Sequence, residues 1–92
     1  EGHTDNVPIR TPQFPSNWEL SAVRATTVLR LFADAGVGGD RLTAIGYADT
    51  RPVESNLLAD GRARNRRVSI LIDSMQPEKG KEVGLGSGAA TP

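Results

Sequence analysis

Apolar side chains recur every three or four residues along the segment 17–36, which is the spacing of one face of an α-helix. The charged residues Arg30 and Asp34 fall off this stripe. The segment therefore predicts an amphipathic helix whose apolar face packs on a core and consists of Leu20, Val23, Thr27, Val28, Leu31 and Ala35.

Both ends of this helix carry signals. Ser16 and, three residues later, Glu19 form a capping-box pair, in which the hydroxyl and the carboxylate can each accept a backbone amide. Gly36 can adopt the left-handed conformation that commonly ends a helix. We therefore expect a helix of about 20 residues that begins near Asn17.

Two later segments have the patterns of β-strands. Residues 41–47 place apolar side chains on both sides, which is typical of a strand covered on both faces. Because a helix precedes this strand, a parallel neighbour is favoured. Residues 66–73 alternate Val68, Ile70 and Ile72 with other side chains and predict a strand that completes the sheet.

The remaining segments predict loops, a short helix and a tail. Residues 6–15 contain three prolines and form a stiff loop, and residues 48–56 are also loop-like. A short helix is expected from about Leu57 to Arg64, interrupted by Gly61. Residues 75–92 are rich in glycine and poor in large apolar side chains, so a disordered tail is predicted.

The composition narrows the class of protein. A chain of 92 residues forms one domain at most. Its 11 basic and 11 acidic residues balance, so a nucleic-acid partner is not expected. There is no cysteine, which excludes a disulfide framework, a thiolate metal site and a cysteine nucleophile. No stretch approaches the roughly 18 apolar residues of a membrane span.

The first residues look like the end of an element. Glu1 to Asp5 resemble the end of a strand, yet nothing precedes them that could close a core. We therefore expect that upstream sequence was removed and that the N-terminal elements of the fold are truncated.

Three separated segments then occur in a recognisable order: Gly2-His3-Thr4-Asp5, Leu20-Ser21-Ala22-Val23-Arg24-Ala25 and Gly61-Arg62-Ala63-Arg64-Asn65-Arg66-Arg67-Val68. As an ordered set they resemble the OmpA-like peptidoglycan-binding family, over roughly residues 1–73. The approach to the helix, residues 14–21, is similar to the MotB and MotD branch of flagellar stator proteins. Ala48 and Asp49 depart from the glycine and glutamate that are common at these positions in the family.

The resemblance implies the fold. We expect an α/β, two-layer sandwich in residues 1–74, with helices packed on one face of a small mixed sheet. The first strand and helix that are usual in the family are absent from this sequence.

The resemblance also implies a binding site for the diaminopimelate-type residue of the stem peptide, whose free end carries an ammonium and a carboxylate. Asp5 would accept the ammonium, and Arg24 would hold the carboxylate through its planar fork. Further ligand contacts are implied for Asn17, Leu20 and Arg67, with Asn65 and Arg66 as weaker candidates.

Each of these residues also has a purely structural interpretation. Asp5 could cap a turn, and Arg24 could shield the core with its aliphatic stem. Arg67 could be a solvated charge or a partner of Asp60, and Leu20 could be a core residue.

The sequence contains no pattern of residues typical of a metal site or of a catalytic site. His3 is the single histidine, and no histidine pair or cysteine accompanies it, so no metal and no cofactor are expected. Neither Ser16 nor Ser21 lies in a nucleophile motif with an orienting third group, so we do not expect an enzyme.

The predicted function is non-covalent binding of peptidoglycan that anchors a flagellar motor stator to the cell wall. The resemblance implies a MotA-type channel subunit as partner, a homodimer, and a periplasmic domain of a protein anchored in the bacterial inner membrane. The alternative is a structural tether between outer membrane and peptidoglycan, of the OmpA or Pal type. A third class, an enzyme that turns over muropeptides, stays open to test.

Overall fold

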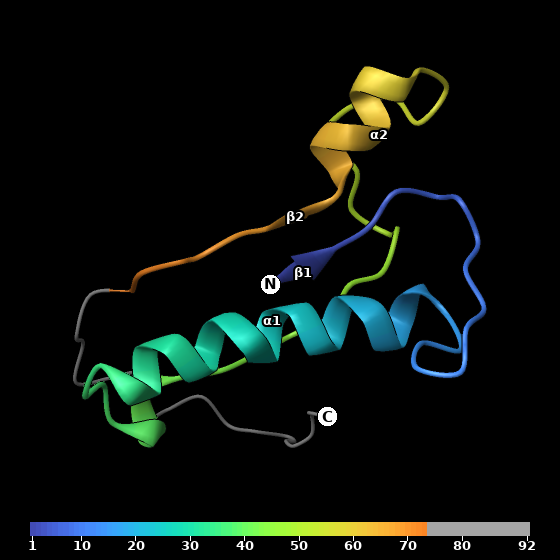
Figure 1. Ribbon diagram of the computed structural model, residues 1–92. Helices are drawn as coiled ribbons and strands as arrows, with labels where there is room; N and C mark the ends of the chain where they lie inside the picture. The colour runs from blue at the N-terminus through green and yellow to red at the C-terminus, as the bar shows by residue number, and fades with distance from the viewer. Residues whose placement is uncertain (74–92) are drawn as a thin grey trace, which may run out of the picture.

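The computed structural model describes residues 1–73, so the predicted tail at 75–92 lies outside the described residues. Within residues 1–73, two short strands and two α-helices follow one another, together with one 3₁₀ turn (Figure 1). In chain order they are β1 (Gly2–His3), α1 (Asn17–Asp34), η1 (Gly39–Arg41), α2 (Ala59–Asn65) and β2 (Arg67–Val68). Within residues 1–73, no helix is long and apolar enough to cross a membrane.

The predicted bounds of α1 are confirmed at both ends. The Ser16 hydroxyl oxygen accepts the Trp18 amide at 3.1 Å and itself donates to the Glu19 carboxylate, so the two side chains cap the helix together. Gly36 has φ +105°, the left-handed conformation expected just past the helix end. The helix therefore starts and stops where these local signals place it.

The buried line of α1 differs from the predicted stripe. Ser21 and Ala25 are its buried residues, whereas Val23 is 46% and Leu31 is 65% exposed. The reason is a close approach of backbones: a Cβ added at Gly2 would lie 2.0 Å from the Ser21 carbonyl oxygen. Only small side chains on the helix can face a strand at this distance.

The sheet is small and mixed, as predicted. β1 pairs with β2 in antiparallel register, and an isolated parallel bridge joins Gly2 to Gly46. The bridge is made by the Gly2 amide, which donates to the Ile45 carbonyl at 2.8 Å, and by the Tyr47 amide, which donates to the Gly2 carbonyl at 2.9 Å. The parallel neighbour expected after the helix is therefore confirmed.

Both predicted strands are wrong in extent. Residues 39–41 form the 3₁₀ turn, and the segment 41–47 joins the sheet through the Gly46 bridge alone. Of the predicted strand 66–73, β2 covers two residues, and mutual hydrogen bonds between Glu1 and Ser69 extend the pairing by one more. A strand needs a partner along its length, and β1 is too short to provide one for residues 70–73.

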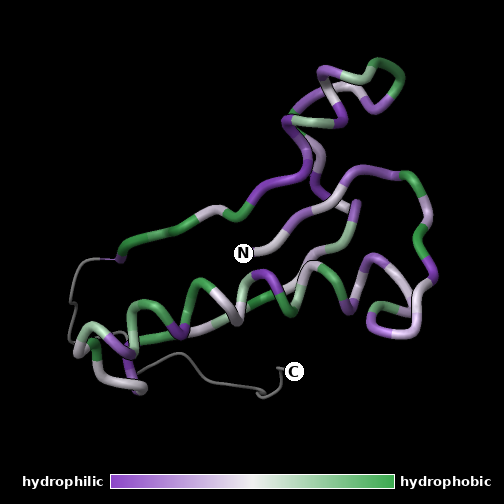
Figure 2. Tube along the Cα trace, viewed as in Figure 1, coloured by the Kyte–Doolittle hydropathy of each residue, from purple (hydrophilic) through white to green (hydrophobic). Residues whose placement is uncertain are grey.

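A wide groove lies where the sheet is incomplete. It has a volume of about 810 Å³ and runs between α1, the segment 40–45 and residues 68–73. Apolar residues, green in Figure 2, occur in all of these segments. Ile70, Leu71 and Ile72 are 57%, 65% and 90% exposed. Phe32 of α1 also lines the groove.

The short helix α2 is confirmed, with bounds shifted by one or two residues. It leads directly into the start of β2 (Figure 1). Gly61 does not interrupt it. A Cβ there would lie 1.9 Å from the Ser55 carbonyl oxygen, so glycine lets the helix pack directly on the preceding loop. α1 covers one face of the sheet, whereas α2 packs on the loop 53–56.

Candidate functional site

Asp5, which follows β1, is held by two groups. One carboxylate oxygen lies 2.7 Å from Nη1 of Arg66, and the other accepts the Val7 amide at 2.9 Å. The residue is 7% exposed. Burial alone raises the pKa of the carboxyl group, but the hydrogen bonds from Arg66 and Val7 outweigh it, so the pKa of Asp5 is lowered. Asp5 is therefore an anion at neutral pH.

Asn17 ties the Asp5 loop to the first turn of α1. Its side-chain amide donates to the Val7 carbonyl at 3.0 Å and to the Asp5 carbonyl at 3.4 Å. The loop that carries three prolines thus returns to the helix at a fixed point. The structure brings Asn17 and Asp5 together and gives Asn17 a positioning role.

Leu20 and Arg24 follow Asn17 on one stripe of α1, because residues three, four and seven apart share a helix face. Leu20 is half-buried, whereas Arg24 is exposed. Within residues 1–73, the side chain of Arg24 makes no hydrogen bond and no ion pair. The stripe lies beside the buried line of Ser21 and Ala25. The guanidinium of Arg24 is open to a ligand.

Asn65 is fully buried and turned toward the loop before α2. Its oxygen accepts the amides of Val53 and Glu54 at 2.8 and 3.0 Å, and its nitrogen donates to the Glu54 carbonyl and the Asn56 side chain. All of its hydrogen-bonding groups are therefore engaged within the protein. This geometry gives Asn65 the role of holding the loop before α2.

Arg67 and Arg66 point to different partners. Arg67 donates to the Arg51 carbonyl at 3.1 Å and does not pair with Asp60. Arg66 is the partner of Asp5, although its side chain is 47% exposed. Arg66 was a weaker candidate in the sequence. The turn at the end of α2 decides where each arginine points, and the residue pattern does not reveal this turn.

His3 is buried in the sheet, 1% exposed, with its ring stacked on Tyr47 at a centroid distance of 5.2 Å. Burial, followed by the positive charge of Arg67, lowers the pKa of His3, and nearby Glu1 opposes this shift. The described residues contain no cluster of three or more side chains suited to holding a metal ion. His3 is therefore a neutral packing residue at pH 7.

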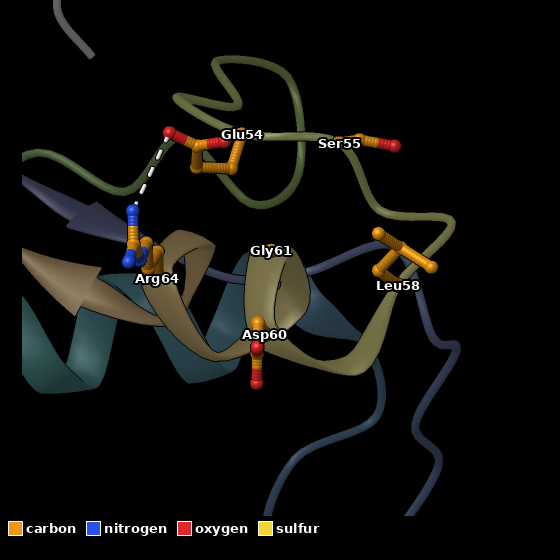
Figure 3. A pocket seen from close by; sticks show the side chains of 6 residues that line it. All are labelled: Glu54, Ser55, Leu58, Asp60, Gly61 and Arg64. Carbon is orange, nitrogen blue, oxygen red and sulfur yellow. Dashed lines mark ion pairs between the residues drawn. The ribbon is translucent and has the colours of Figure 1, made fainter.

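A small pocket of about 180 Å³ lies beside α2 (Figure 3), and Asp5 is not among the residues that line it. Its charged residues are Glu54, Asp60 and Arg64. The side chains of Glu54 and Arg64 form an ion pair at 3.7 Å and are 49% and 70% exposed. Such exposed ion pairs contribute only about 0–1 kcal/mol to the stability of the folded protein. None of the residues predicted to bind a ligand lines this pocket, so the candidate site is the one around Asp5.

Known proteins are similar to this chain. The model of the OmpA family matches residues 1–66, and the chain belongs to this family. It is 44% identical over 72 residues to Motility protein B of Bacillus subtilis. The aligned part covers 77% of this chain and 28% of that protein. It is 43% identical over 75 residues to Outer membrane porin F of Pseudomonas aeruginosa, covering 80% of this chain and 20% of that protein.

A solved structure agrees. The cell wall anchor of the T6SS from Pseudomonas aeruginosa superposes with a TM-score of 0.67 and 51% identity, over 71% of this chain and 46% of that one. The family and the α/β fold predicted from the sequence are thereby confirmed, and the family membership agrees with the expectation that the chain is not an enzyme. The chain spans less than a third of the curated relatives named above.

Proposed function

We propose that this domain binds the stem peptide of peptidoglycan without altering it and thereby anchors a flagellar motor stator to the cell wall. The observation that carries the proposal is the Asp5 carboxylate, ionised and fixed at the meeting point of β1, α1 and the end of α2. The ligand is the diaminopimelate-type residue, whose ammonium matches Asp5 and whose carboxylate matches Arg24.

The geometry supports two-point recognition. Asp5 is held in place by Arg66 and Val7, so it loses little freedom when a ligand binds. Arg24 is exposed and unpaired within the described residues, and helical side chains lean toward the N-terminus of their helix, which is the end where Asn17 holds the Asp5 loop. Leu20 supplies apolar contact between the two charges.

Co-sedimentation with insoluble peptidoglycan tests the proposal. The parent chain should pellet with the wall, and Asp5→Asn and Arg24→Gln should each weaken binding by at least about tenfold, because each leaves a ligand charge without its partner. Asp34→Asn and Arg30→Gln are matched controls on the exposed side of α1 and should bind as the parent does. Circular dichroism verifies that all variants fold.

A parent chain that stays in solution, or controls that lose as much binding as the site variants, would exclude the proposed site. Incubation with muropeptides completes the test: unchanged muropeptides fit a binding domain, whereas turnover would establish an enzyme.

The stator role rests on the similarity to Motility protein B. It implies a MotA-type channel subunit as partner, a homodimer, and a place in the periplasm as part of an inner-membrane protein. A chimera in which this domain replaces the matching part of Motility protein B should restore swimming, and the same chimera with Asp5→Asn should not. Mass measurement of the chain in solution at high concentration tests the dimer, and a monomer would contradict it.

An outer-membrane tether is the second candidate, favoured by the similarity to Outer membrane porin F. It shares the wall site and needs no channel subunit. The chimera separates the two: wall binding by the isolated domain together with a non-motile chimera would favour the tether.

A further inference from the structure

The sheet has a second face, turned away from α1. Gly2 faces α1, because a Cβ there would meet Ser21. Side chains alternate along a strand, so the next residue, His3, points to the opposite side. Arg67 is the residue directly across from His3 on β2 and therefore shares its face.

Two arginines, Arg51 and Arg67, and the ring of Tyr47 lie in contact with one another or with His3 on this face. Tyr47 stacks on His3 with an angle of 11° between the rings, and the Arg51 guanidinium carbon lies 4.2 Å from the centre of the Tyr47 ring. Arg67 donates to the Arg51 carbonyl, which joins the two arginines. We call Tyr47, Arg51 and Arg67 the arginine face.

The arginine face has an excess of unpaired donors. Within residues 1–73, neither Arg51 nor Arg67 forms an ion pair with a carboxylate. Nη1 of Arg67 is shielded from solvent and has no hydrogen-bond partner among the described residues. An unpaired buried donor costs about 1–3 kcal/mol, and natural proteins accept such costs mainly at functional sites.

We propose that Arg51 and Arg67 form a subsite for a carboxylate, which takes the free C-terminal carboxylate of the bound peptide while Asp5 and Arg24 hold its diaminopimelate-type residue. This inference rests on the proposed function. The subsite adjoins that site, because Asp5 follows His3 by two residues, about 7 Å along an extended chain. Stacking on Tyr47 holds the Arg51 fork flat, the orientation that suits a planar carboxylate.

A pair of peptides tests the subsite. A synthetic stem peptide that contains diaminopimelate is titrated into the chain as the free acid and as the C-terminal amide, and binding is followed by calorimetry. The parent should prefer the free acid by about tenfold, the size expected for a charge-assisted contact. Arg51→Gln should remove this preference and leave affinity for the amide unchanged.

Arg30→Gln is the matched control, because it removes the same charge from an exposed position on α1. Arg51→Lys keeps the charge without the fork and should retain only part of the preference, which separates recognition from a general charge effect. A parent that binds both peptides equally, or an Arg51→Gln variant that keeps the preference, would refute the subsite while the proposed function stands. A parent that binds neither peptide would refute both.

Discussion

The Arg66 guanidinium and the Asp5 carboxylate meet at 2.7 Å, although they are 61 residues apart in the sequence. Arg66 ends α2, and Asp5 follows β1, so the contact closes the domain from its last helix to its first strand. The pair serves both the stability of the fold and the charge state of the proposed site.

Loss of Arg66 should therefore destabilise the chain. Arg66→Gln leaves the Asp5 carboxylate largely buried with one hydrogen bond, and we expect a loss of about 1–2 kcal/mol, moderated because Arg66 is half exposed. Urea unfolding measures it. Arg64→Gln, on the same helix but in the exposed pair with Glu54, should change stability by less than about 0.5 kcal/mol. Equal losses in both variants would contradict the structural role of the Asp5 contact.

Asp5 should also give the fold an acid-sensitive contribution. Its folded pKa lies below the ordinary value of 3.8, so the unfolded chain binds the proton more readily. This contribution is complete above about pH 4 and is lost as the pH falls through the folded pKa. Unfolding of the parent and of Asp5→Asn, measured between pH 5 and pH 2, should show a smaller pH dependence for the variant. Parallel curves would show that Asp5 does not contribute.

His3 should act in a higher pH range. Its folded pKa lies below 6.5, so the unfolded chain takes up the proton first, and stability should fall as the pH decreases from about 6.5 toward the folded pKa. His3→Gln should remove this slope between pH 7 and pH 5, where Asp5 stays ionised. NMR titration of the His3 ring provides the folded pKa directly, and a value above 6.5 would reverse the expected sign.

The glycine that meets α1 from the parallel segment should not tolerate a side chain. At Gly46 a Cβ would lie 2.7 Å from the Ala22 amide nitrogen, so Gly46→Ala should cost about 1–3 kcal/mol as backbones move apart. Gly39→Ala is the control, since nothing lies within 4 Å of its added Cβ. Thermal unfolding compares the two, and an unchanged melting temperature in Gly46→Ala would show that the backbones do not approach so closely.

Local signals in the sequence predicted the local structure. Ser16, Glu19 and Gly36 determine the ends of α1 through contacts within a few residues, and these ends were predicted correctly. The buried line of α1 was not, because Ser21 is buried by Gly2 and Gly46, which are distant in sequence and carry no side chain to reveal the contact.

The site shows the same limit. The family motif placed Asp5, Asn17 and Arg24 in one region, and in the structure Asn17, at the start of α1, holds the loop that begins at Asp5. The motif alone does not distinguish residues that contact a ligand from residues that hold a loop in place. The side-chain amide of Asn65 hydrogen-bonds to the loop before α2, and Arg66 rather than Arg67 reaches Asp5. Both outcomes depend on backbone direction at the end of α2.

The position of β1 between two neighbours has a mechanical consequence. On one side its backbone bonds to residues 45–48 and on the other to residues 67–69, and Asp5 follows directly after it. Hydrogen bonds in a sheet run across the strands, so a pull on Asp5 along β1 loads the bonds of both edges together, in shear, instead of opening them one at a time. Under the proposed function, a load applied at Asp5 would thus be shared across both edges of the sheet, which suits an anchor held under tension.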